Sequence, residues 1–135
     1  SQVPRLVTIT GTSTTTQTSD SVTGMTGLNI TPAAGTYEIE FTGAMSNSGS
    51  GSTATCTATA YKTVGGAGGT ATAITSTVRQ IGSGSGANGA TVRAGFCGPA
   101  VGAVMDGITN LEGRWKVGAN TGTRYECAIK FRRTA

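Results

Sequence analysis

Apolar and polar residues alternate strictly in the segment that leads to the C-terminus. From Arg124 to Arg132 every second position is apolar, which is the period of a β-strand with one face in a core and one face in water. The positions expected to face the core are Tyr125, Cys127, Ile129 and Phe131. The positions expected to face solvent are Arg124, Glu126, Lys130 and Arg132. This pattern predicts a strand of an antiparallel sheet with one buried face.

The same alternation occurs in two earlier segments, 111–117 and 37–45. The residues that it places on the core face are Leu111, Gly113, Trp115 and Val117 in one segment, and Tyr37, Ile39, Phe41 and Met45 in the other. The residues that it places on the outer face are Glu112, Arg114, Lys116, Glu38, Glu40 and Thr42. Both segments are therefore predicted to be strands that are buried on one face.

Weaker strand signals fill the rest of the chain. They lie at Arg5–Thr10, Gly24–Ile30, Thr53–Tyr61, Ala71–Ile81, Thr91–Phe96 and Val101–Met105, with loops rich in Gly and Ser between them. No window shows a helical period with capping residues. About eight or nine short strands at regular spacing predict an all-β protein, a single antiparallel β-sandwich or barrel.

The length of 135 residues suits one domain with one core. Residues 13–21 are almost all Thr, Ser and Gln, so we expect residues 1–21 to be a polar N-terminal arm or an edge strand and residues 22–135 to form the sandwich. No apolar run approaches the length of a membrane-spanning helix, so no membrane partner is expected. Ser1–Arg5 lacks the apolar stretch of a signal peptide, and we expect a protein made in the cytoplasm without secretion.

The composition argues against an enzyme. The chain has no histidine, which removes the commonest general base and metal ligand. Glu38 and Glu40 share one strand face and are a conceivable carboxylate pair, but we expect them to be solvated or paired with basic residues of a neighbouring strand or subunit. The glycine-rich stretch Gly82–Gly89 is followed by no helix pattern, so it is expected to be a hairpin tip and not a phosphate-binding loop. No catalytic residue, cofactor or small-molecule substrate is predicted.

Three cysteines, Cys56, Cys97 and Cys127, give an odd number. None stands in the C-x-x-C spacing of a zinc site, and no metal is predicted. A secreted domain framed by disulfides would usually have an even set. We therefore expect three reduced, buried and unreactive thiols.

The charge is distributed unevenly. Residues 1–60 carry a net charge of −2 and residues 61–135 a net charge of +6. If the two C-terminal strands are neighbours, their outward basic residues form one patch, which makes these residues candidates for binding an acidic partner: Arg114, Lys116, Arg124, Lys130, Arg132 and Arg133. Nucleic acid is disfavoured because Trp115, Tyr125 and Phe131 are all expected to point inward, leaving no exposed aromatic for base stacking. A solvated sheet face is the simple alternative.

Three segments resemble the C1q/TNF-like jelly roll. The stretch 28–41, Leu-Asn-Ile-Thr-Pro-Ala-Ala-Gly-Thr-Tyr-Glu-Ile-Glu-Phe, is similar to the segment of that family in which a small-residue turn and Gly-Thr-Tyr join two strands. Leu111–Val117, with Trp115, resembles the penultimate strand, and Gly122–Ile129 resembles the last strand. The resemblance runs from about Leu28 to Arg132 and implies a jelly-roll fold.

Jelly-roll modules of this kind are frequent in tailed-phage virions, and the short loops rich in Thr, Gly and Ser fit such a protein. The resemblance implies a non-enzymatic virion protein that decorates or cements the capsid as a homotrimer, with the major capsid protein or another virion protein as partner. The alternative is a receptor- or glycan-binding tip of a phage fibre or spike. Loops that hold mostly Gly, Ser, Thr, Ala and Asn argue against that alternative.

Overall fold

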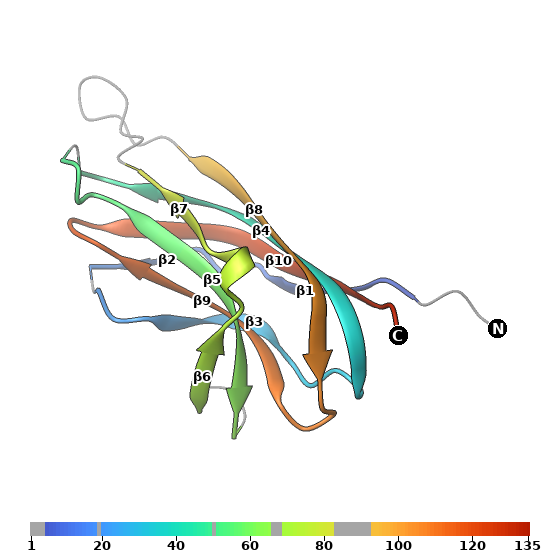
Figure 1. Cartoon of the computed structure of the whole chain (residues 1–135). Helices are drawn as coiled ribbons and strands as arrows, with labels where there is room; N and C mark the ends of the chain where they lie inside the picture. The colour runs from blue at the N-terminus through green and yellow to red at the C-terminus, as the bar shows by residue number, and fades with distance from the viewer. Residues whose placement is uncertain (1–4, 19, 50, 66–68, 83–92) are drawn as a thin grey trace.

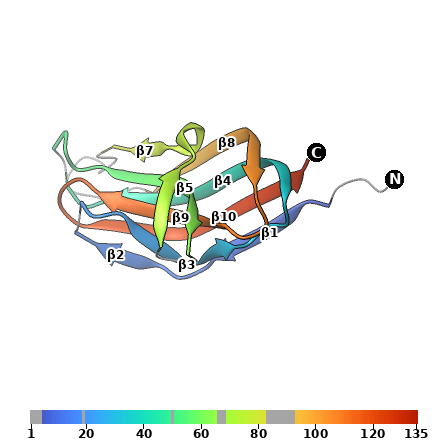
Figure 2. The ribbon, with the colours of Figure 1, turned by 60° about the horizontal axis from the view of Figure 1, so that its bottom comes forward.

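The protein is a sandwich of two five-stranded antiparallel sheets in the computed structural model, which describes residues 5–18, 20–49, 51–65, 69–82 and 93–135 (Figures 1 and 2). Sheet A consists of β1 (Val7–Gly11), β2 (Thr15–Gln17), β4 (Gly35–Asn47), β8 (Ala94–Met105) and β10 (Gly122–Arg133). Sheet B consists of β3 (Thr23–Ile30), β5 (Cys56–Val64), β6 (Thr70–Ala73), β7 (Arg79–Ile81) and β9 (Asn110–Val117). One turn of 3-10 helix, η1 (Thr75–Thr77), is the only helical segment in the described ranges.

The chain crosses repeatedly from one sheet to the other. The strand order is β1–β10–β4–β8 in sheet A, where β2 also pairs with β10, and β3–β9–β5–β6 in sheet B, where β7 also pairs with β5. Strands β3 to β5, and again β7 to β10, alternate between the sheets, which is jelly-roll topology. The prediction of a single antiparallel jelly-roll sandwich is confirmed.

The core lies between the sheets and is built by the alternating positions. The core residues expected from the three alternating segments are all buried except Tyr125: Tyr37, Ile39, Phe41, Met45, Leu111, Gly113, Trp115, Val117, Cys127, Ile129 and Phe131. The Tyr37 and Phe131 rings meet edge to face, with centroids 5.8 Å apart. β4 and β10 are neighbours in sheet A, so alternate residues of both strands enter the same core layer.

The prediction that Tyr125 faces the core and Arg124 faces solvent is wrong. Between Arg124 and Cys127 the register of β10 against β4 shifts, because three residue steps on β10 match two on β4. One extra residue inverts the alternation on its N-terminal side. Arg124 is therefore buried with 1% exposure, whereas Tyr125 is half-buried, donates or accepts a hydrogen bond with Ser46 (2.9 Å) and has the Arg93 guanidinium 3.8 Å from its ring centroid.

The N-terminal segment is part of sheet A. All five residues of β1 pair in register with residues 127–131 of β10, and Val7 and Ile9 pack against the core. β1 also lies beside β3 of the other sheet, where Gly27 has a φ of 86° and a side chain would come within 2.9 Å of the Thr10 carbonyl oxygen. Residues 7–17 thus close one side of the sandwich and do not form a detached arm.

Two strands expected from the sequence, Thr91–Phe96 and Val101–Met105, are joined in the single strand β8. β8 runs through Pro99, which is tolerated because β8 is an edge strand and its outer side needs no ladder hydrogen bonds. Residues 91 and 92, and residues 83–89 of the glycine-rich stretch, lie outside the described residues.

The three cysteines are free, but they do not share one environment. Cys56 and Cys127 are buried in the core, and this burial raises the pKa of both thiols. Cys97 is exposed on the outer side of β8. The expectation of three buried thiols is wrong for Cys97, because its strand alternates and Cys97 follows the inward-facing Phe96.

Candidate docking surface

The six basic candidates do not form one patch. β9 and β10 are neighbours in sequence but belong to different sheets, so their outward side chains lie on opposite faces of the sandwich. Arg114 and Lys116 lie on the outer face of sheet B, and Lys130 and Arg132 lie on the outer face of sheet A. The expectation of a single basic surface is therefore wrong, since it assumed that consecutive strands pair.

Arg124 is excluded as a residue that contacts a partner. Its guanidinium lies inside the sandwich, where Nη1 donates a 3.3 Å hydrogen bond to the carbonyl oxygen of Gly11. Its Nε and Nη2 atoms are buried and have no hydrogen-bond partner among the described residues. An arginine remains charged under all ordinary conditions, so this is a buried cation with little compensation.

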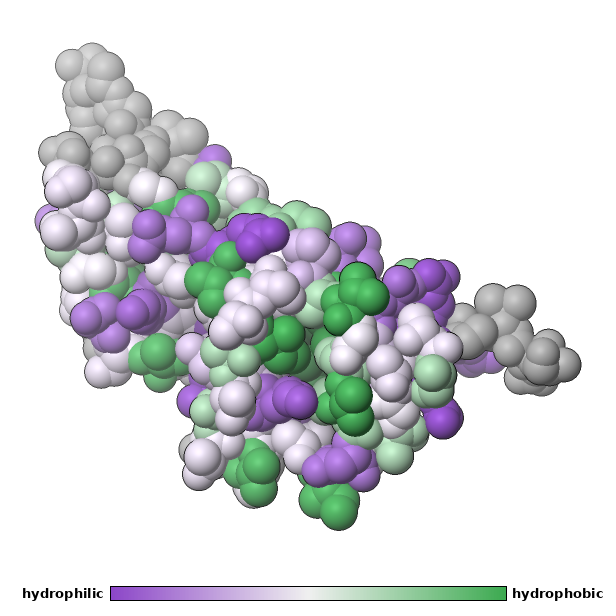
Figure 3. Space-filling model, in the orientation of Figure 1, coloured by the Kyte–Doolittle hydropathy of each residue, from purple (hydrophilic) through white to green (hydrophobic). Residues whose placement is uncertain are grey.

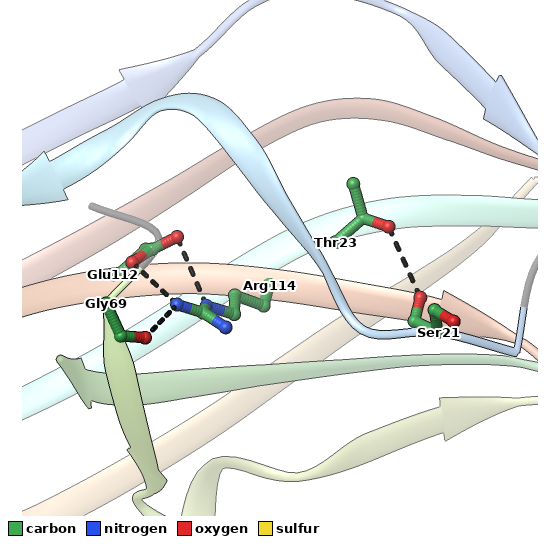
Figure 4. Close-up of polar contacts among 5 residues, drawn as sticks. All are labelled: Ser21, Thr23, Gly69, Glu112 and Arg114. Atoms are coloured by element: carbon green, nitrogen blue, oxygen red, sulfur yellow. Dashed lines mark hydrogen bonds and ion pairs between the residues drawn. The ribbon is translucent and has the colours of Figure 1, made fainter.

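Arg114 is held within its own sheet. The guanidinium lies 3.2 Å from the Glu112 carboxylate and donates to the carbonyl oxygen of Gly69, also at 3.2 Å (Figure 4). The Tyr61 ring lies below it, 5.5 Å from the guanidinium carbon. Glu112, expected to face solvent, is buried on the outer face of the sheet by this packing. Arg114 thus stabilises the local structure and presents little free charge.

Lys116 and Arg133 make only surface contacts. Lys116 lies 3.9 Å from the exposed Asp20 carboxylate. Arg133 donates from Nε to the carbonyl oxygen of Ala135 at 3.2 Å, next to the C-terminus. These contacts are solvent-exposed and contribute little to stability.

The outer face of sheet A carries two of the expected site residues, Lys130 and Arg132. Its outward positions lie in two rows across the strands β1, β10, β4 and β8, and we call this surface face A. The rows are Thr10, Ala128, Thr42 and Cys97, and Thr8, Lys130, Glu40 and Pro99, followed by the pair Arg132 and Glu38. Face A is formed mostly by small side chains.

The charges on face A are matched across strands. Arg132 forms an ion pair with Glu38, and Lys130 stands directly opposite Glu40 in the register. Beside them lies a groove of about 440 Å³, lined by Leu6, Glu38, Ile39, Glu40, Pro99, Ala100, Val101, Lys130 and Arg132. The expectation that Glu38 pairs with a basic residue of a neighbouring strand is confirmed.

A tight turn between β8 and β9 is organised by one carboxylate. Asp106 accepts hydrogen bonds from the backbone N–H groups of Ile108 (2.8 Å) and Thr109 (2.7 Å) and from the Thr109 hydroxyl (2.8 Å). These three bonds lower the pKa of Asp106 to about 2, and the bond from the Thr109 backbone N–H has the largest effect, followed by that from the Ile108 N–H. The turn therefore holds Ile108 in one exposed position.

The Asp106 turn gives a pH prediction. The carboxylate has a lower pKa in the folded protein than in the unfolded chain, so its stabilising effect is fully present above about pH 4 and is lost as the pH falls through about 2. The free energy of unfolding of the Asp106→Ala variant should therefore be lower than that of the wild type at pH 5, and the difference should shrink towards pH 2. Urea unfolding at each pH measures it. A difference that stays constant over this range would contradict the assignment.

Within the described ranges, no three His, Cys, Asp or Glu side chains are grouped so that they could hold a metal ion. The described helical turn is too short to cross a membrane. The groove on face A brings Glu38 and Glu40 together with Lys130 and Arg132, a balanced set without a histidine.

The fold has known counterparts. No family model and no curated protein matches the chain. The structure of Eiger TNF from S. frugiperda is similar with a TM-score of 0.71 and 11% identity, covering 99% of this chain and 94% of that one. Murine APRIL matches with a TM-score of 0.48 and 9% identity over 96% of this chain and all of the other. The similarity to Eiger confirms the TNF-like jelly-roll fold that the sequence resemblance implied, and it shows the fold alone.

Proposed function

We propose that the protein is a non-enzymatic structural component of a tailed-phage virion, made in the host cytoplasm, that decorates and cements the capsid as a homotrimer. Its partner is the major capsid protein or another virion protein. The observation that carries the proposal is face A, an outer sheet surface formed mostly by small side chains, on which Arg132 forms an ion pair with Glu38. Such a surface loses few solvated charges when another subunit covers it.

In this proposal, face A of each subunit is covered by its neighbour in the trimer. A cyclic trimer buries the same contact three times, and binding to the shell then stabilises the shell by mass action. Charges near the face steer the encounter and fix the register, while the buried area holds the complex. Association should therefore be slower at high salt, because charges are screened beyond about 8–10 Å.

The test is a pair of matched threonine variants. Thr42 lies at the centre of face A between Ala128 and Cys97, whereas Thr57 is an equally half-buried threonine on the outer face of sheet B. Thr42→Arg should give a folded monomer that no longer attaches to heads, because the long cation blocks the contact. Thr57→Arg should remain trimeric on heads. Mass measurement and sedimentation with purified heads give the readout.

Cys97 supplies an independent readout of the same contact, since its thiol is exposed on face A in the single subunit. A thiol reagent should label it rapidly in the Thr42→Arg variant and slowly in the assembled wild type. The proposal fails if Thr42→Arg still assembles and Cys97 is equally reactive in both forms.

One observation favours the alternative, a receptor- or glycan-binding tip. The bulge in β10 brings Tyr125 to the surface beside Arg93, and this combination of an aromatic ring with a donor is common in polar binding sites. Separating virions into heads and tails distinguishes the two functions. A protein found only on tail structures would favour the tip.

A further inference from the structure

A second surface lies on the open side of the sandwich, between β8 of sheet A and the β5–β6–η1 region of sheet B (Figure 1). Two adjoining grooves of about 410 and 290 Å³ share Lys62, Thr72 and Val104, and we call them together the flank groove. Their remaining lining residues are Val64, Ala73, Ile74, Thr75, Ser76, Ala100, Val101, Gly102, Ala103, Asp106 and Thr109. Of these residues, Ala100 and Val101 also line the groove on face A.

Three exposed valines lie together along the flank groove. Val101 is 86% exposed, Val64 63% and Val104 62%, and Ala73 and Ala103 line the groove between them. Figure 3 shows apolar side chains, interspersed with polar ones, over the same side and at the lower end of the molecule, where β5 and β8 end and β6 begins. Apolar side chains gathered in this way, and not scattered singly, mark a site of interaction.

The edge of β8 does not accept a continuous added strand. Pro99 has no N–H group to donate, and Gly102 has a φ of 77° at a bulge, where the register against β4 shifts. Both features interrupt the backbone hydrogen bonds that an added strand would need, and both are common in natural edge strands. An occupant of the flank groove must therefore be recognised mainly by its side chains.

Lys62 is the one charged residue among the described residues that line the larger groove. Its ammonium group donates a 3.2 Å hydrogen bond to the carbonyl oxygen of Val104, and a lysine ammonium has two further donors. Asp106 lines only the smaller groove, where its carboxylate accepts hydrogen bonds from the N–H groups of its own turn. The larger part of the flank groove therefore complements an apolar segment that carries a carboxylate.

We propose that the flank groove binds an extended segment of another protein, with apolar side chains on both sides of one carboxylate. The carboxylate pairs with Lys62, and the flanking side chains contact Val64 and Val104 on one side and Val101 and Ile74 on the other. This site is separate from the centre of face A and does not require the trimer.

The probe is a short capped peptide, Ala-Val-Glu-Val-Ala, and its glutamine analogue, titrated into isotope-labelled protein and followed by NMR. The Glu peptide should perturb the amides of residues 62–64 and 101–104, and the Gln peptide should bind about five- to tenfold more weakly, the usual effect of losing one charge-assisted hydrogen bond. Lys62→Gln should abolish the difference between the peptides. Lys116→Gln, a matched change on the outer face of sheet B, should leave it intact.

The proposal is overturned if neither peptide perturbs these amides at roughly 5 mM, where even a millimolar complex is populated. It is also overturned if the same amides shift with protein concentration alone, because the occupant would then be a second copy. Thr42→Arg should bind the peptide normally. A Thr42→Arg variant that still forms trimers on heads and binds the peptide would therefore contradict only the function proposed for face A. A folded, monomeric Thr42→Arg variant that no longer binds the peptide would contradict only the flank groove.

Discussion

Replacing Trp115 with alanine should lower the free energy of unfolding by about 3–5 kcal/mol. Trp115 is the single tryptophan, is 2% exposed and lies in the core on β9, between Thr23 of β3 and Ala58 of β5. Its ring packs close to Gly122, where a side chain would come within 3.3 Å of it. Removing the ring leaves a cavity that surrounding strands cannot fill, since both sheets are fixed by their ladders. Urea unfolding monitored by circular dichroism measures this change in the free energy of unfolding, because the variant has no tryptophan fluorescence to monitor.

The neighbouring Lys116→Ala variant is the control for this measurement. Lys116 follows Trp115 on the same strand but lies on the outer face, so its truncation should change the free energy of unfolding by no more than about 0.5 kcal/mol. Equal losses for the two variants would mean that the inward and outward faces of β9 are wrongly assigned.

Replacing Arg124 with methionine should raise the free energy of unfolding, by up to about 4 kcal/mol, the upper limit seen when apolar side chains of similar volume replace buried ion pairs. The guanidinium is 1% exposed, and two of its nitrogen atoms have no partner in the described structure. Methionine is flexible enough to follow the same path past Leu28 and Gly11. The substitution removes one hydrogen bond, to the Gly11 carbonyl oxygen, which lies close to the limit of such bonds at 3.3 Å.

Arg132→Met on the same strand serves as the comparison, because Arg132 is exposed and its ion pair with Glu38 lies on the surface. It should change stability by less than about 1 kcal/mol. If Arg124→Met were instead less stable than the wild type, contacts within the sandwich would offset the desolvation of the guanidinium. The destabilising effect inferred from its burial would then be wrong.

The sequence alone determined the fold class and most of the core. Residues 37–41 and 127–131 alternate with period two, and that period is a property of the extended backbone, which directs successive side chains to opposite faces. The inward positions of β9 were predicted from the same alternation. The composition, with no histidine, likewise rules out a Ser-His-Asp or Cys-His site within this sequence.

Only the tertiary structure decided which strands are neighbours and where the alternation breaks. The six basic residues look like one patch in sequence, but jelly-roll topology sends β9 and β10 to different sheets. One extra residue in β10 buried Arg124 and turned Tyr125 out of the core, because a bulge depends on pairing with β4, a strand far away in the sequence. The apolar flank groove was equally hidden, since it is formed by β8 and β6 from two different sheets. Local pattern fixes which face a residue takes, whereas long-range pairing fixes which residues share that face.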